Sequence, residues 1–130
     1  MALFYDGCVC AICHKPLIWE QDLLGFTFVG SRHPLVQMFD DSICHRDCMS
    51  RWEHRDEFVK AWNHGAMDGL GPHYFLELTP SGDVRYLSWF GRQLYRVGWK
   101  RSPLLPTIAV YHQRRKESRR RWKERRQEKK

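Results

Sequence analysis

The sequence predicts an α+β protein with short antiparallel strands and helical segments. Cysteines and histidines gather at residues 8–14 and 44–48, and apolar runs bounded by glycine and proline recur between residues 17 and 99. From Thr107 onward the chain contains neither glycine nor proline, which favours a terminal helix. The chain has 130 residues, of which 42% are hydrophobic, enough for one small core with an appendage. It is too short for an eight-stranded α/β barrel or for a dinucleotide-binding domain joined to a substrate domain.

The net charge of +7 is concentrated at the C-terminal end of the chain. Residues 112–130 contain eleven Lys/Arg and three Glu, a net charge of +8. The first 111 residues hold the other eleven basic residues and twelve acidic ones, so the body is close to neutral. The basic excess therefore belongs to a terminal appendage, which we predict to be a helical tail over residues 107–130.

The sequence carries no sign of export or of a membrane span. No apolar run approaches the roughly 20 residues of a membrane-spanning helix. Residues 1–6 lack a basic region followed by a long apolar stretch. Five cysteines without an export signal indicate a reducing compartment, where clustered cysteines are more often metal ligands than disulfides. We therefore expect a cytoplasmic protein, or a nuclear one if the source is a nucleated cell.

Two pairs of residues have the spacing of zinc ligands. Cys10 and Cys13 form a C-x2-C pair, and 31 residues later His45 and Cys48 form an H-x2-C pair. Zinc prefers four tetrahedral thiolate and imidazole ligands, and each spacing can present two donors on one side of an ion. The sequence thus predicts a Zn²⁺ site made by these four residues.

Other assignments of the cysteines remain open at this point. Cys44 lies four residues before Cys48 and could replace His45 on one face of a helix. Cys8 is a weaker alternative, because only one residue separates it from Cys10. The cysteines could also be small buried apolar residues, or form a redox C-x-x-C pair, although Pro16 fits the latter badly.

The N-terminal half resembles a treble-clef zinc finger. The resemblance rests on Cys10-x2-Cys13, an intervening hairpin and His45-x2-Cys48 at the head of a helix, and it covers residues 8–63. The order of ligands is also similar to the first zinc-binding half of a LIM domain. No cysteine follows Cys48 and the 31-residue spacer is longer than the LIM pattern, so the chain is not a LIM domain. Because such fingers bind nucleic acids or proteins and also occur in nucleases, the resemblance implies zinc but no single function.

We divide the chain into a zinc-binding module over residues 1–64, a hairpin region over 65–106 and the tail over 107–130. In the module we expect short strands or hairpins over residues 17–40. A helix is expected from about Cys44 to Asn63, with Asp41 and Ser42 at its N-cap and His64 and Gly65 at its C-terminus.

The second region predicts a β-hairpin from Tyr74–Leu78 and Val84–Phe90, joined by a Pro/Gly turn after a glycine-rich loop over 65–73. A third strand is possible over Gln93–Trp99. Strand-spaced aromatics are usually core, and we expect this of Trp89, Phe90, Tyr95 and Trp99. Any that are exposed would lie beside arginines and lysines and extend the basic surface.

The tail is the candidate nucleic-acid-binding segment. Arginine forms bidentate contacts with phosphates, and a tryptophan within the run could stack on a base. The candidate residues are Arg114, Arg115, Lys116, Arg119, Arg120, Arg121, Trp122, Lys123, Arg125 and Arg126. The tail could instead be a solvated helix or contact an acidic protein, and Trp122 could anchor it to the body. A membrane surface is disfavoured because the tail lacks an apolar face.

The sequence therefore predicts a non-enzymatic, zinc-stabilised module that contacts nucleic-acid phosphates, DNA or RNA, through its tail. An adaptor or inhibitor, immunity-type or regulatory, that binds an acidic protein partner is the first alternative. A metal-dependent nuclease is the second. We favour no catalytic residue, because four protein ligands close a zinc ion to water and no nucleophile or phosphate-loop motif occurs.

Overall fold

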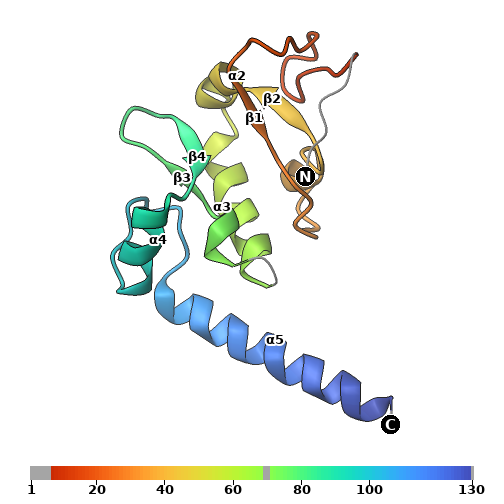
Figure 1. Cartoon of the computed structure of the whole chain (residues 1–130), viewed down its shortest axis with the longest axis vertical. Coiled ribbons are helices and arrows are strands. Elements are labelled where there is room, and N and C mark those ends of the chain that lie inside the picture. Colours follow the sequence, from red (N-terminus) through yellow and green to blue (C-terminus); the bar gives the residue numbers. More distant parts are fainter. Residues whose placement is uncertain (1–6, 69–70, 130) are drawn as a thin grey trace.

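The computed structural model describes residues 7–68 and 71–129. Residues 1–6, to which the export-signal prediction applied, and Gly69 and Leu70 of the predicted loop lie outside this part. The chain mixes helices with two small antiparallel hairpins, as an α+β class requires (Figure 1). Its elements are β1 (Leu23–Gly25), α1 (Pro34–Gln37), β2 (Ile43–His45), α2 (Arg46–Arg51), α3 (Arg55–Met67), the 3-10 turn η1 (Pro72–Tyr74), β3 (Leu76–Leu78), β4 (Val84–Tyr86), α4 (Trp89–Arg96) and α5 (Ile108–Glu128).

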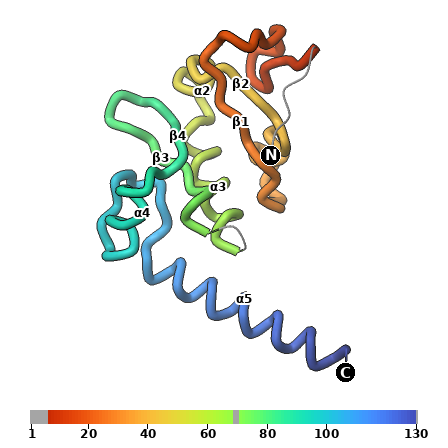
Figure 2. The backbone as a smooth tube through the Cα atoms, viewed as in Figure 1, coloured from red at the N-terminus to blue at the C-terminus, as the bar shows by residue number. Residues whose placement is uncertain are grey.

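The two hairpins lie on either side of α3 along the chain. β1 pairs with β2 with Leu24 opposite Cys44, and β3 pairs with β4 with Glu77 opposite Arg85. The second hairpin confirms the predicted hairpin around the Pro/Gly turn, although its strands are shorter than expected. The N-terminal turn and the end of α5 lie at opposite ends of the molecule (Figure 2).

The single helix predicted from Cys44 to Asn63 is wrong. The segment begins in β2, continues in α2, and is interrupted at Trp52, whose backbone is extended (φ −72°, ψ 130°). The ring of Trp52 lies 5.3 Å from Phe39 and 5.8 Å from Phe58, so tertiary packing overrides the helical spacing. The second helix, α3, then continues beyond Asn63 to Met67. The predicted N-cap is also wrong, because a strand follows Ser42.

Residues 35–39 form no strand in the structure. They belong to α1 and the turn that follows it. The helix begins at Pro34, and proline is favourable in the first helical turn because its missing N–H would have no partner there. The side chain of His33 caps this turn by accepting a hydrogen bond from the Leu35 N–H at 3.2 Å. Helix α1 and the turn after it bury the side chains of Val36 and Phe39 in the core.

A helix, α4, replaces the third strand that the sequence allowed over residues 93–99. The Ser88 hydroxyl caps its N-terminus by accepting from the Gly91 N–H at 3.1 Å. Gly91 and Tyr95, four residues apart, form its buried face. The core prediction is thus correct for Tyr95 and wrong for Trp89, Phe90 and Trp99, which are exposed. Trp89 and Phe90 are exposed because the helix has a different period from a strand, and Trp99 lies beyond the end of the helix.

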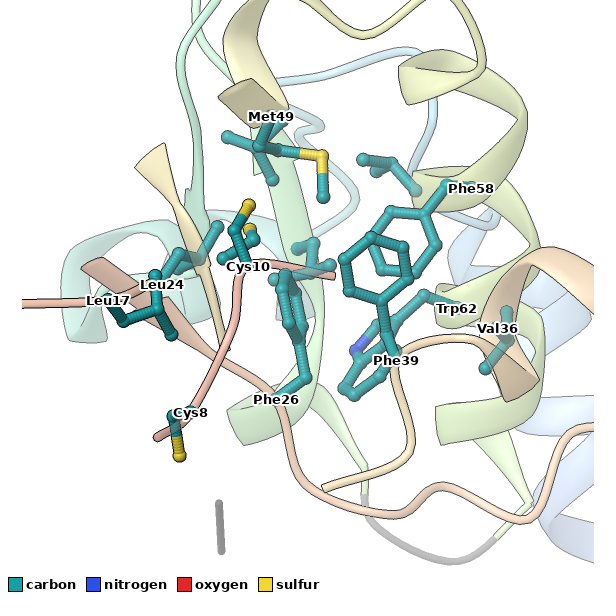
Figure 3. Packing of buried hydrophobic residues seen from close by; sticks show 14 residues of the cluster. Cys8, Cys10, Leu17, Leu24, Phe26, Val36, Phe39, Met49, Phe58 and Trp62 are labelled. Carbon is teal, nitrogen blue, oxygen red and sulfur yellow. The ribbon is translucent and has the colours of Figure 1, made fainter. Parts of the chain in front are cut away.

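Phe26 lies at the centre of the first core cluster (Figure 3). Its ring is 5.2 Å from Phe39, 5.3 Å from Phe58 and 5.2 Å from Trp62, and all four side chains are fully buried. The three contacts are edge-to-face, the arrangement that aromatic quadrupoles favour. The segment after β1, the turn after α1 and helix α3 are therefore joined by one aromatic cluster.

A second core cluster joins the C-terminal elements to α3. Ala66 and Met67 at the end of α3 contribute to it, together with Phe75, Leu87, Tyr95 and Leu105. Ile108 and Tyr111, from the first turn of α5, pack against this cluster. The predicted C-terminal helix is confirmed, and its first turns are fixed to the body.

Asn63 is a buried polar residue that links three segments. Its side-chain oxygen accepts from the Leu76 N–H at 2.7 Å, and its amide nitrogen donates to the Leu76 carbonyl at 2.9 Å and the Leu104 carbonyl at 3.2 Å. Asn63 thereby satisfies buried backbone groups of β3 and of the segment before α5.

We expect Asn63→Ala to lower the free energy of unfolding by about 3 kcal/mol, because it leaves buried backbone groups without this partner. Urea unfolding followed by circular dichroism measures the change. Lys60→Ala, at an exposed position of the same helix, is the matched control and should change stability little. Equal effects of the two substitutions would contradict this role of Asn63.

Candidate metal centre

Four side chains come together at one end of the first hairpin. One donor atom from each of Cys10, Cys13, His45 and Cys48 lies within 4.8 Å of the others, so the group could hold a metal ion. Cys10 is buried and the other three are half-buried. These are the four residues that the two sequence spacings predicted, brought together across 31 intervening residues.

The first ligand pair lies on a tight turn. The His14 N–H donates to the Cys10 carbonyl at 2.9 Å, the Cys10 N–H donates to the Lys15 carbonyl at 3.0 Å, and His14 adopts a left-handed backbone (φ 61°). An isolated bridge between Val9 and Pro16 closes the turn. This geometry points backbone N–H groups of Ile12 and Cys13 at the Cys10 sulfur, at 3.4 and 3.5 Å.

The second ligand pair lies at the junction of β2 and α2. His45 ends β2 and Cys48 lies in the first turn of α2. The Nδ1 atom of His45 is 3.5 Å from the sulfurs of both Cys13 and Cys48. The His45 N–H also donates to the Cys10 sulfur at 3.5 Å, so the two ligand pairs are already in contact through the protein.

Gln21 orients the imidazole of His45. Its Oε1 atom lies 3.1 Å from Nε2 of His45 and 2.8 Å from the Ile18 N–H. Since the Ile18 N–H can only donate, the atom it meets must be the amide oxygen, which then accepts from Nε2–H. The proton is thus held on Nε2, and Nδ1 is left free to bind a metal. The sequence alone does not predict this contact, because nothing in the spacing of the ligands identifies Gln21.

The protein alone shifts the pKa values of the thiols. Burial raises the pKa of Cys10, but hydrogen bonds from the backbone of Cys13, His45 and Ile12 outweigh it and lower the pKa to about 7. Burial, with the hydrogen bond to Cys13, raises the pKa of Cys48 to about 11. The site therefore favours the Cys10 thiolate by itself, whereas metal ligation is needed to deprotonate Cys48 near neutral pH.

Cys44 and Cys8, the alternative ligands, lie outside the group of four. Cys44 is fully buried, and alternation along β2 directs its side chain to the face opposite His45. Burial raises the pKa of its thiol, as expected of a core residue. Cys8 and Cys10 point in opposite directions (Figure 3). The interpretation of cysteine as a small buried apolar residue thus fits Cys44.

All ten candidate nucleic-acid-binding residues lie on α5. One face of its first turns is half-buried. On this face Arg114 pairs with Asp68 at 3.1 Å, and the Ser118 hydroxyl donates to the Asp68 carbonyl at 3.4 Å. From Arg119 to Lys129 every residue is exposed. Trp122 is 58% exposed, and the guanidinium carbon of Arg126 lies over its ring, 4.7 Å from the ring centre. Trp122 therefore does not anchor the helix to the body.

Comparison of the chain with known protein families, with curated proteins and with solved structures finds no match. Within residues 7–68 and 71–129, no helix combines the length and the apolar character that crossing a membrane requires.

We expect Cys48→Ala to abolish stoichiometric metal binding, because it removes one of the four donors. Cys44→Ala should retain one ion per chain, since Cys44 lies outside the group, although it costs packing energy. Mass spectrometry under native conditions, after purification in the presence of Zn²⁺, measures the number of metal ions bound per chain in both variants. Metal retained by Cys48→Ala and lost by Cys44→Ala would show that the ligand set is wrong.

Proposed function

We propose that the chain is a non-enzymatic, zinc-stabilised binding module whose C-terminal helix contacts nucleic-acid phosphates. Two parts of the molecule support this function. The cluster of three cysteines and one histidine supports the zinc site, and the charge and position of α5 support the contact with phosphates.

The donor set favours zinc among the metals of the cell. Three thiolates and an imidazole suit a tetrahedral Zn²⁺ structural site, whereas Mg²⁺ and Ca²⁺ require oxygen ligands. The order of a C-x2-C turn, a hairpin and a helix carrying the second pair is similar to a treble clef. Four protein ligands leave no position for water or substrate, which favours a structural role over a nuclease.

The single observation that carries the nucleic-acid proposal is the projecting basic half of α5. In Figure 1 the helix extends away from the body. Its exposed part, residues 119–129, contains seven Lys/Arg and two Glu. One of those acids, Glu124, lies 3.9 Å from Arg120, so most of the cations remain available. A rod of available cations can replace the counterions that a phosphate backbone binds, and their release drives association.

Removal of residues 119–130 should abolish binding of a nucleic-acid duplex and leave the body folded, because the contacts of Tyr111, Arg114 and Ser118 remain. For the intact chain we expect affinity to fall by about a thousandfold between 50 and 200 mM salt, as for roughly six phosphate contacts. Fluorescence anisotropy with a labelled oligonucleotide across a salt series measures both effects, and circular dichroism reports folding of the truncated chain.

A charge-matched pair of triple variants distinguishes a site on α5 from general attraction. Arg119→Gln, Arg120→Gln and Arg121→Gln together should weaken binding strongly. Arg32→Gln, Arg51→Gln and Lys60→Gln change the net charge equally at exposed positions of the body and should have little effect. The proposal would be overturned if both triple variants lost the same oligonucleotide affinity, or if the chain bound an acidic protein in preference to oligonucleotides.

A further inference from the structure

The surface of α4 and the turn after it expose large apolar side chains. Trp89 is 66% exposed, Phe90 60%, Val97 73% and Trp99 71%. Burial of aromatic area is a main source of stability, so a small protein that leaves three large rings in solvent within eleven residues loses that contribution. Several exposed large apolar side chains within one short segment are typical of an interaction surface. We call Trp89, Phe90, Arg96, Trp99 and Lys100 the α4 patch.

Local structure fixes the backbone that carries the α4 patch. The Gly98 N–H donates to the Tyr95 carbonyl at 3.0 Å and the Trp99 N–H to the Leu94 carbonyl at 2.8 Å, which together form a Schellman cap. Gly98 has φ 91°, a conformation that favours glycine. The cap turns the chain sharply at the end of α4 and leaves Trp99 in solvent.

The inner face of α4 holds the helix close to the body. A Cβ atom at Gly91 would lie 2.8 Å from Cδ1 of Leu87, so this position accepts only glycine without a shift. Tyr95, also on the inner face, is fully buried, and its ring lies 5.4 Å from Phe75. Because Gly91 and Tyr95 face inward, Trp89 and Arg96, seven residues apart, share the outward face.

The charge around the α4 patch is entirely basic in sequence. Residues 84–107 contain five Lys/Arg and no Asp or Glu. The carboxylate of Glu77, only 2% exposed, holds Arg85 at 2.8 Å and Arg101 at 3.5 Å. In the described part of the chain, Arg96 and Lys100 take part in no ion pair. Exposed rings with available cations beside them complement a partner that is anionic and presents flat apolar groups.

Resting on the proposed function, we propose that the α4 patch binds a single-stranded nucleic acid by stacking its bases on Trp89 and Trp99. Arg96 and Lys100 contact the phosphates between those bases. Unpaired bases offer faces to aromatic side chains, whereas the bases of a duplex are already stacked on one another. The patch therefore gives the protein a preference for single strands, and α5 adds phosphate contacts that single and double strands share.

The test compares the full-length chain and its variants on a 20-nucleotide oligothymidine strand, the matching oligouridine strand and a 20-base-pair duplex. We expect Trp89→Ala and Trp99→Ala each to weaken binding of the oligothymidine by about tenfold, the effect of losing one stacked base. Duplex affinity should change less than about twofold. The oligouridine arm shows whether the surface distinguishes RNA from DNA, and stacking on either strand supports the proposal.

Matched variants separate stacking from loss of apolar surface. Val97→Ala removes an equally exposed apolar side chain that cannot stack, and should leave single-strand affinity unchanged. Trp89→Phe and Trp99→Phe keep a ring and should recover most of the affinity. Thermal melting is expected to be unchanged for all of these variants, because the substituted side chains are exposed.

Three results would overturn the inference. The first is that the tryptophan variants bind single strands as tightly as the parent chain, and the second is that they lose single-strand and duplex affinity equally. The third is that they lose binding to vesicles of anionic lipid with no change for oligonucleotides, which would assign the patch to a membrane. If the parent chain binds duplex and strand with steep salt dependence while the tryptophan variants are unchanged, only this inference fails. If the parent chain binds neither, the proposed function fails as well.

Discussion

The convergence of four donor atoms at one point ties together parts of the chain that have little else in common. The C-x2-C turn before β1 contains no regular helix or strand, and β1 and β2 are each three residues long. Strands this short are marginal on their own. A structural zinc site contributes an apparent ~10–16 kcal/mol in finger peptides, comparable with the whole ~5–15 kcal/mol of a domain. Ligation of the proposed ion at Cys10, Cys13, His45 and Cys48 would therefore determine whether this end of the molecule is folded.

Helix α3 connects this end of the molecule to the rest, because its residues belong to both core clusters. Phe58 and Trp62 face the aromatic cluster next to the metal centre, and Ala66 and Met67 face the second cluster under α4 and α5. Between the two clusters, Asn63 satisfies backbone groups of β3 and of the segment before α5. The two proposed binding surfaces, α5 and the α4 patch, are thus carried by elements that pack on one helix. The proposed metal centre would support them through the two core clusters.

The sequence predicts which donor residues lie together better than it predicts the path of the backbone. The ligand spacings, the Pro/Gly hairpin turn and the glycine-free tail are local signals, and each leads to the structure found. The long helix from Cys44 fails because apolar residues at helical spacing cannot reveal that Cys44 pairs with Leu24 across a hairpin. The third strand fails because Gly91 and Tyr95 pack at a helical period within an aromatic-rich run. Gln21 could not be found, since its role depends on a contact between residues 24 positions apart.

A zinc K-edge X-ray absorption spectrum of the purified, reduced protein would show whether these four residues bind zinc. We expect a four-coordinate ion with three sulfur neighbours at about 2.3 Å and one nitrogen neighbour at about 2.0 Å. Four sulfurs would mean that Cys44 or Cys8 replaces the imidazole, and His45 would then have no role as a ligand. A shell of oxygen and nitrogen alone, or a fully folded protein that contains no zinc, would contradict the metal centre and the architecture built on it.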